Sequence, residues 1–418
     1  MNRINKIYRE YPRKFWLVVM VSFIDRVGGT LLFPYFALYI TQKFQVGMTE
    51  AGLVLGIFSI AGLFGGVAGG AITDRFGRRR LILFGLVASA ISTLGLGLVS
   101  SFSVLVPLAV LIGMLFEISG PAHMAMLADI LPEKQRQEGF GILRVVNNFA
   151  WIIGPTIGGF IANRSFFTLF VIDAVVSCLV AVLFYRLISE TYTPIRAAGE
   201  QGSGSIFATF KGYILVLRDS AYLGFLGAGI AVGLVYQQLY NSLSVYLRDV
   251  HGIAPQGYGF LMSVSGITVI LLQFWVTRRI KHHPPFVIMA AGSLFYAAGF
   301  TMFGLVSRYE LFVLAVVVIT VGEMAFVPTS QALASSFAPE EMRGRYMAAF
   351  SLMWSIPSAI GPAAAGVILD HYNPNLLWWL GGVLCAVAAL GYLALQGRLG
   401  AQPRFASARG EAEAAGAG

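Results

Sequence analysis

Hydrophobic positions in this chain are gathered into long blocks that short polar segments separate. The blocks begin near Phe15, Glu50, Arg80, Ser103, Gln137, Ser165, Ala221, Pro255, Pro285, Tyr309, Arg343 and Asn375. Most are longer than the ~18 residues that mark a membrane-spanning helix, since a hydrocarbon core of ~30 Å requires ~20 residues. The pattern predicts an all-α integral membrane protein with twelve transmembrane helices.

Composition agrees with this prediction, because 57% of the 418 residues are hydrophobic and only 12% are charged. A water-soluble globular protein would not sustain these proportions. The first apolar block follows a basic segment, as in a signal peptide, but it is too long for one and no small-residue cleavage site follows it. We interpret it as a retained helix.

The net charge of +9 is distributed according to membrane topology. If the N-terminus is cytoplasmic, the loops on the opposite side hold only Lys43, Arg164, Arg248 and Arg308, and most of the 29 lysines and arginines lie inside. This positive-inside pattern predicts that both termini are cytoplasmic. The basic excess therefore does not indicate nucleic-acid binding.

The two halves of the chain are related by an internal repeat. At an offset of 207 residues, identical pairs include Tyr39 with Tyr246, Pro121 with Pro328, Gly154 with Gly361, and Pro155 with Pro362. Two six-helix halves in parallel orientation follow from this repeat. We expect an N-terminal bundle at 1–188, a cytoplasmic linker at 189–219, a C-terminal bundle at 220–398 and a disordered cytoplasmic tail at 399–418.

The segment GGAITDRFGRRR, residues 69–80, places charge and glycine between two apolar blocks. It resembles the loop 2–3 signature of the major facilitator superfamily through Gly70, Asp74, Arg75, Gly77, Arg78 and Arg79. The resemblance, supported by a repeat that covers nearly all of the chain, implies the major facilitator fold of two pseudosymmetric six-helix bundles.

Two further motifs resemble those of transporters within that superfamily. Gly154, Pro155, Gly158 and Gly159 are similar to the fifth-helix motif of drug:proton antiporters. Gly322, Glu323 and Pro328 resemble the tenth helix of bacterial multidrug antiporters. This resemblance to bacterial antiporters implies the inner membrane of a prokaryote. The chain departs from those antiporters in its fourth helix, which has no deep arginine and carries Glu117 instead.

Three acidic residues lie deep within predicted helices: Asp25, Glu117 and Glu323. An ionisable group at such depth is costly and should face a cavity or a partner. The resemblance implies that helices 1, 4, 7 and 10 line a central cavity, so we expect these carboxyls to converge there and to couple transport to protons. The alternative for Asp25 is an ion pair with Arg26, although adjacent helical residues do not face each other.

Polar and aromatic residues on the same set of helices predict a substrate cavity. Its candidates are Arg26, Arg144, Asn148, Trp151, Tyr236, Gln237, Tyr240, Asn241 and Trp354. Aromatic walls with few fixed hydrogen-bonding groups suit bulky, amphipathic or cationic molecules. The alternative is that these side chains simply pack between helices.

The loop 2–3 segment predicts a cytoplasmic gate. Its candidates are Gly70, Asp74, Arg75, Gly77, Arg78 and Asp129. We expect Gly66 and Gly70 to allow close helix packing and Asp74 to contact a helix N-terminus of the other half. For Asp129 three interpretations stay open: an ion pair with Arg78, one with Arg144, or exposure to interfacial water.

The sequence therefore predicts a monomeric exporter of amphipathic or cationic small molecules, working by alternating access and driven by protons without a cofactor or metal. No enzyme motif was found. A proton-coupled carrier of sugars, other small solutes or lysolipids is the alternative, with Gln237, Gln238 and Asn241 faintly similar to sugar porters. A non-transporting receptor on the same fold is a second alternative, against which the buried acids argue.

Overall fold

The computed structural model describes residues 10–191, 216, 218–339, 342–402 and 405, apart from the side chains of Asp74, Glu133 and Gln137. Twelve segments of this described part are long and apolar enough to cross a membrane, which is the predicted number. Most of the predicted linker and nearly all of the predicted tail lie outside the described residues.

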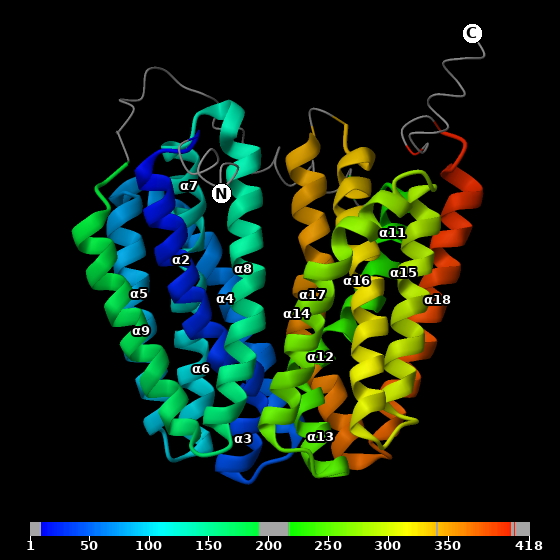
Figure 1. Cartoon of the computed structure of the whole chain (residues 1–418), viewed down its shortest axis with the longest axis horizontal. Helices are drawn as coiled ribbons and strands as arrows, with labels where there is room; N and C mark the ends of the chain where they lie inside the picture. The colour runs from blue at the N-terminus through cyan, green and yellow to red at the C-terminus, as the bar shows by residue number, and fades with distance from the viewer. Residues whose placement is uncertain (1–9, 192–215, 217, 340–341, 403–404, 406–418) are drawn as a thin grey trace. The chain divides into compact units, whose positions relative to one another are not determined.

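The described helices form two units (Figure 1). The helices of unit 1 are α2 (Arg13–Leu32), η1 (Phe33–Tyr35), α3 (Phe36–Phe44), α4 (Met48–Phe76), α5 (Arg78–Leu98), α6 (Phe102–Glu117), α7 (Gly120–Ile130), α8 (Glu133–Ala162) and α9 (Phe166–Leu187). Residues Leu247–Gly266 also belong to unit 1.

Unit 2 contains the remaining helices. They are α11 (Ser220–Tyr236), α12 (Gln238–Asn241), α13 (Leu243–His251), α14 (Pro255–Ile280), α15 (Pro285–Phe303), α16 (Tyr309–Phe337), α17 (Arg343–His371) and α18 (Asn375–Leu399). The first residues of α13 and the last part of α14 are in this unit, while the segment between them is in unit 1.

Helix starts agree with those expected from hydropathy, because apolar length and turn residues mark them clearly. Five helices begin at the expected residue: Pro255, Pro285, Tyr309, Arg343 and Asn375. The others begin within a few residues of it.

Three of the predicted continuous helices are interrupted instead. The first is broken by the 3-10 turn at Pro34, and the fourth is broken between Glu117 and Gly120, just before Pro121. The seventh is divided at Gln237 and again at Ser242. Proline lacks an amide donor and so removes one backbone hydrogen bond, and Pro34 and Pro121 lie at the first two breaks.

Three helix pairs of unit 1 have counterparts in unit 2. In unit 1, α2 packs against α8 and α9, and α5 packs against α9; in unit 2, α11 packs against α17 and α18, and α15 packs against α18. The hydroxyl of Tyr39 donates to the carbonyl of Leu96 at 2.7 Å, and that of Tyr246 donates to Phe303 at 2.9 Å. All four residues obey the 207-residue offset, so the repeat extends to individual hydrogen bonds.

The core of unit 1 lies where α2, α5, α7 and α9 meet. Phe15, Ile82, Leu127 and Phe184 are fully or almost fully buried there. In unit 2 a comparable aromatic core includes Trp378, which is completely buried between α15, α13 and α18 residues. Many apolar side chains elsewhere remain exposed, as expected for helices that face lipid.

Close packing between α4 and α6 depends on glycines, but not on the two that we expected. A Cβ at Gly65 would collide with the carbonyl of Met114, and one at Gly69 would collide with that of Ile118. Gly70 instead has open space around it, and Gly66 has only a distant contact with Glu117. The prediction was wrong by one position because neighbouring helical residues point about 100° apart.

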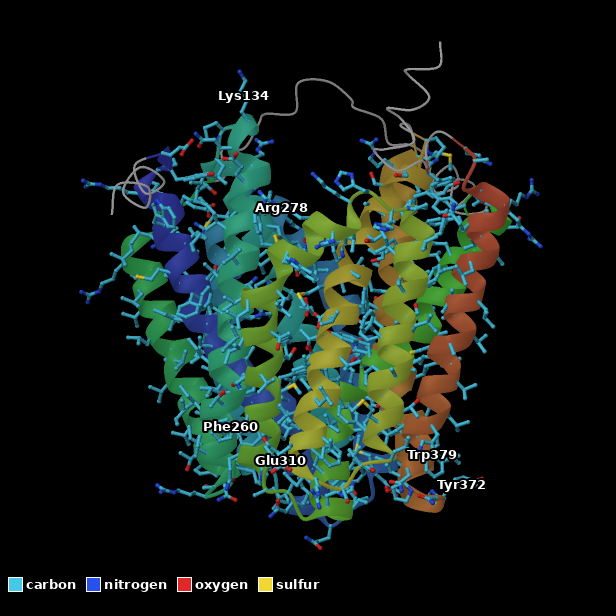
Figure 2. All side chains as sticks on the ribbon, turned by 45° about the vertical axis from the view of Figure 1, so that its right-hand side comes forward. Lys134, Phe260, Arg278, Glu310, Tyr372 and Trp379 are labelled. Atoms are coloured by element: carbon cyan, nitrogen blue, oxygen red, sulfur yellow. The ribbon has the colours of Figure 1, made fainter. Side chains whose placement is uncertain are left out.

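Aromatic side chains lie at both ends of unit 2 (Figure 2). Arg278 lies at one end of its helices, with its guanidinium 4.2 Å from the ring centroid of Phe274, and Glu310, Tyr372 and Trp379 lie at the other end. Aromatic residues concentrate at both membrane interfaces, so this is the arrangement expected for helices that cross a bilayer.

We expect Gly65→Ala to destabilise the protein by about 1–3 kcal/mol, because the added methyl group forces α4 away from α6. Gly70→Ala, in the same helix with open space around it, should be neutral or stabilising by up to about 1 kcal/mol. Thermal unfolding of the purified protein in detergent compares the two. Equal effects of both substitutions would contradict the α4–α6 packing described here.

Candidate functional site

In unit 1, two of the predicted acids are close to a single cation. Asp25 is half-buried and the adjacent Arg26 is exposed. The Arg26 guanidinium interacts electrostatically with both Asp25 and Glu117. Asp25 and Glu117 are therefore brought into one charged group within this unit, with Arg26 linking α2 to α6.

The position of Glu117 follows from the helix break. It is the last residue of α6, and its side chain lies along the glycine surface of α4, where a Cβ at Gly62 would be 3.2 Å from it. The side chain is exposed rather than packed in a core. Because Gly62 has no side chain to fill the space beside Glu117, water or a ligand can reach the Glu117 carboxyl.

A buried fourth carboxyl, Asp173 of α9, also interacts electrostatically with Asp25. It is 6% exposed and accepts a hydrogen bond from Thr93 at 2.9 Å. The sequence identifies Asp173 as an acid in the middle of an apolar block, and we ranked it below Asp25, Glu117 and Glu323 because the sixth helix is peripheral in the superfamily that the chain resembles.

In unit 2, Glu323 is surrounded by tyrosines from three neighbouring helices. It interacts electrostatically with Tyr236 at the end of α11, Tyr240 of α12 and Tyr296 of α15. The hydroxyls of Tyr236 and Tyr240 are 3.0 Å apart. The ring of Trp354 on α17 is 5.9 Å from that of Tyr236. We call Tyr236, Tyr240, Tyr296, Glu323 and Trp354 the Glu323 site.

Three members of the aromatic wall of the Glu323 site were predicted, and Tyr296 was missed. Its ring lies 5.7 Å from that of Tyr236. Its hydroxyl is buried and makes no hydrogen bond with the described residues. Helix periodicity could not identify Tyr296, because its helix, α15, carries no acidic or amide residue that marks a polar face.

The two amide residues of the predicted cavity hold the break after α11. Gln237 donates a hydrogen bond to Ser358 on α17, and the side chain of Asn241 donates to the carbonyl of Gln237 at 3.0 Å. Asn241 is buried. The Gln237 contact joins this segment to α17, and the Asn241 contact stays within the segment itself.

Four residues at helical spacing on α8 change from exposed to buried along the helix. Arg144 and Asn148 are exposed, Trp151 is half-buried, and Pro155 is buried. The polar members thus lie on an accessible surface of unit 1, in the half of α8 that precedes its glycine motif.

The fifth-helix motif is a close-packing surface. A Cβ at Gly154 would collide with Thr30, and one at Gly158 would collide with Leu31. A Cβ at Gly159 would be 2.7 Å from the hydroxyl of Tyr35, which donates a hydrogen bond to the carbonyl of Pro155. The motif therefore fixes α8 against α2 and η1.

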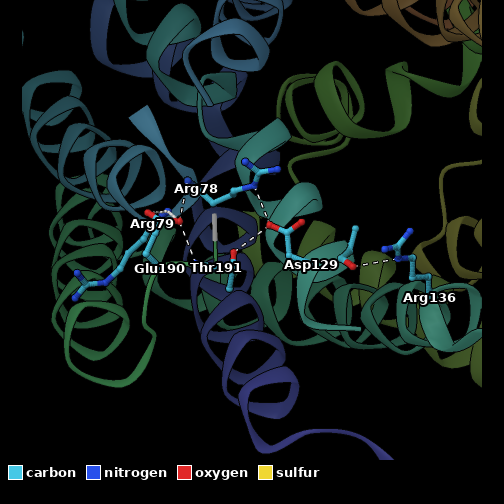
Figure 3. A network of polar contacts seen from close by, with 7 residues as sticks. Arg78, Arg79, Asp129, Arg136, Glu190 and Thr191 are labelled. Carbon is cyan, nitrogen blue, oxygen red and sulfur yellow. Dashed lines mark hydrogen bonds and ion pairs between the residues drawn. The ribbon is translucent and has the colours of Figure 1, made fainter. Parts of the chain in front are cut away.

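The loop between α4 and α5 is held by an ion pair (Figure 3). Arg78 Nε lies 2.9 Å from Asp129 Oδ2, at the end of α7, and Thr191 Oγ1 donates to the same oxygen at 3.2 Å. Of the partners left open for Asp129, the structure shows Arg78. The ion pair joins the start of α5 to the end of α7.

Residues just after α9 complete this network. Glu190 accepts backbone hydrogen bonds from Arg78 at 3.2 Å and from Arg79 at 3.1 Å, at the positive end of α5. The Arg79 guanidinium donates to the carbonyls of Ile188 and Tyr185. Sequence analysis did not identify Glu190, since it lies in the predicted linker.

Gly77 allows the tight turn that brings Glu190 to the start of α5. It has φ = +89°, a conformation that favours glycine, and a Cβ there would be 2.8 Å from the Glu190 carboxylate. Arg75 is exposed, and its guanidinium lies over the ring of Phe76 at 5.4 Å. The side chain of Asp74 lies outside the described residues, so its predicted helix contact stays a prediction.

Twelve membrane-crossing helices, repeated helix pairs and intramembrane acids with aromatic surroundings define a multi-pass membrane transporter. The sequence profile of the Major Facilitator Superfamily matches residues 18–362 and 242–415. The chain belongs to this superfamily.

Relatives of this chain include a cation antiporter and a multidrug resistance protein. The chain is 28% identical to a Na(+), Li(+), K(+)/H(+) antiporter of Planococcus maritimus, over 85% of this chain and 89% of that protein. It is 24% identical to the multidrug resistance protein MdtH of Escherichia coli strain SE11, over 88% of this chain and 86% of that protein. The fold is similar to that of a POT family transporter crystallised with 5-aminolevulinic acid, with a TM-score of 0.78 and 15% sequence identity. The match covers 93% of this chain and 96% of that protein.

A double-mutant cycle tests the ion pair between Arg78 and Asp129. We expect Arg78→Ala and Asp129→Ala to show a coupling free energy of about 0.5–1 kcal/mol in unfolding measurements, since the pair is only partly exposed. The matched control combines Asp129→Ala with substitution of the exposed Arg80 by alanine, for which effects should add. A coupling near zero for Arg78 would contradict the pair.

Proposed function

We propose that this transporter exports lipophilic organic cations in exchange for protons, by alternating access. The single observation that supports this most strongly is the Glu323 site: one carboxyl with three tyrosines and a tryptophan in unit 2. A carboxylate attracts a cation, and aromatic rings contribute both apolar contact and cation–π attraction.

A shared binding group provides the coupling. When Glu323 is protonated it is neutral and has no charge to attract a cation; when it is ionised, a cation can replace the proton. A proton and a cation that cannot occupy Glu323 together produce antiport. Each ligand shifts the population of the transporter toward the conformational state to which it binds more tightly. No cofactor is required in this scheme, since the proton gradient supplies the free energy.

The amide contacts favour a cation over a sugar. A sugar site needs several hydrogen-bonding groups that are available to the ligand. Gln237, Gln238 and Asn241, which carried the sugar alternative, make hydrogen bonds to Ser358, to the carbonyl of Leu234 and to that of Gln237. The hydroxyls and rings of the Glu323 site are instead grouped around an acid.

Export of an inorganic monovalent cation is the second candidate. The named activity of the Planococcus maritimus relative favours it, as do the Asp25 and Glu117 carboxyls near Arg26 in unit 1. A small hydrated ion gains little from an aromatic wall, which is why we place the organic cation first. Sodium and an organic cation can be compared in the same transport assay.

Orientation and assembly belong to the same proposal. The distribution of lysine and arginine supports cytoplasmic termini in a prokaryotic inner membrane, with the loop 2–3 network of Arg78, Arg79, Asp129, Glu190 and Thr191 on the cytoplasmic side. We propose that the protein acts as a monomer. In this orientation the network would serve as part of the cytoplasmic gate, with Asp74 and Arg75 beside it.

The proposed function predicts that purified protein in lipid vesicles moves tetraphenylphosphonium against its gradient when a pH gradient is imposed. The reason is that a proton moving down its gradient displaces the cation from the shared carboxyl. Radiolabelled cation flux measures the result, with sodium tested in parallel. Wild-type flux that ignores the pH gradient for both cations would contradict proton coupling.

Glu323→Gln should reduce this driven flux to the level of protein-free vesicles, since the amide keeps the shape of the carboxyl but neither binds a proton nor carries charge. Glu310→Gln is the matched control, because Glu310 is an exposed acid in the first turn of the same helix, α16. It should retain wild-type flux. Driven transport that survives in Glu323→Gln would remove Glu323 from the mechanism.

A further inference from the structure

Asp173 is a carboxyl enclosed by three helices of unit 1, and the proposed function gives it no role. It lies within α9 and is 6% exposed. Its Oδ2 accepts a hydrogen bond from Thr93 of α5 at 2.9 Å. Its Oδ1 lies against α2, where a Cβ at Gly28 would be 2.9 Å away. Burying a carboxylate with a single hydroxyl donor is costly, because a charged carboxylate can accept about four hydrogen bonds.

The nearest acid on α2 lies on the side that faces Asp173. Asp25 precedes Gly28 by three residues, so the two occupy the same face of α2, about one turn apart. The electrostatic interaction between Asp25 and Asp173 agrees with this placement. Two ionised carboxylates held together in a medium of low dielectric constant repel each other, and one proton on the pair removes the repulsion.

The other charges around the pair do not neutralise both members. On α2, Arg26 interacts with Asp25 and also with Glu117 of α6. On α5 the group that faces Asp173 is the neutral hydroxyl of Thr93. On α9 itself, Val176 lies against Gly28, and Ser177 follows Asp173 by one turn. Both residues are uncharged. The Arg26 guanidinium thus interacts with Asp25 and Glu117, and the neutral hydroxyl of Thr93 is the hydrogen-bond donor to Asp173.

We propose that Asp25 and Asp173 form a proton-sharing pair, which gives unit 1 a proton-binding position in addition to the one at Glu323. Asp25, the half-buried member, exchanges protons with water. Asp173, the buried member, sets how readily Asp25 does so. The step is a proton transfer alone: a proton from water binds a carboxylate oxygen, and no other bond forms or breaks.

This inference rests on the proposed proton-driven function for its physiological meaning, but the pair itself can be tested without transport. A pH titration by infrared spectroscopy of the full-length protein follows the C=O stretch of protonated carboxyls. We expect wild-type protein to show a carboxyl band near neutral pH that is absent in Asp173→Asn. Ser177→Ala, one turn along the same helix, should leave the band unchanged.

The second readout is the pH midpoint of driven tetraphenylphosphonium flux. Asp173→Asn keeps an oxygen that can accept from Thr93 but removes the negative charge beside Asp25. We expect the midpoint to move to lower pH by about one unit, since the repulsion that favours the protonated pair is lost. Thr93→Val should move it in the opposite direction, because the ionised pair loses a hydrogen-bond donor.

The outcomes separate the two proposals. An infrared spectrum in which Asp173→Asn and wild type have the same protonated-carboxyl bands would overturn the pair, whatever transport shows. Wild-type flux indifferent to the pH gradient, together with an Asp173-dependent band, would refute the proposed function and leave the pair intact. If Asp173→Asn does not fold, an unchanged band and midpoint in Thr93→Val would overturn the inference.

Discussion

An ionised side chain loses most of its hydration when it enters a bilayer, and the structure of this transporter is organised around that cost. At membrane depth a charge must be neutralised by a proton, paired, or given access to water or a ligand. Asp25 and Glu117 interact with Arg26, and Glu323 lies among tyrosine hydroxyls. The proposed transport cycle uses the same cost, because it makes Glu323 alternate between a bound proton and a bound cation.

The backbone accommodates these groups by interrupting helices where polar residues occur. The break after α6 begins at Glu117, and the breaks around α12 lie at Gln237 and Ser242. Discontinuous helices are a common way to build binding sites within membranes, since their free ends and exposed backbone groups face a cavity and not lipid. In unit 2 the break also places Tyr236 and Tyr240 on either side of Gln237, and both reach Glu323.

Hydropathy was sufficient to predict the number of membrane-spanning segments and where their helices start. The Tyr39 and Tyr246 pair shows how far the repeat extends, because both hydroxyls bond to equivalent carbonyls. What the sequence could not supply is rotation about each helix axis. A difference of one position separates Gly65 and Gly69, which contact α6, from Gly66 and Gly70, which were expected to. Tyr296 was missed for a related reason, because only its packing against Tyr236 marks the face of α15 on which it lies.

The central claim is that a cation and a proton compete for Glu323. Its most direct test is the release of protons when tetraphenylphosphonium is added to the purified transporter in weakly buffered detergent solution. A pH-sensitive dye reports the change without vesicles or gradients. The account predicts that wild-type protein releases protons as the cation binds and that Glu323→Gln releases markedly fewer. Binding of the cation to wild-type protein with no proton release would contradict it.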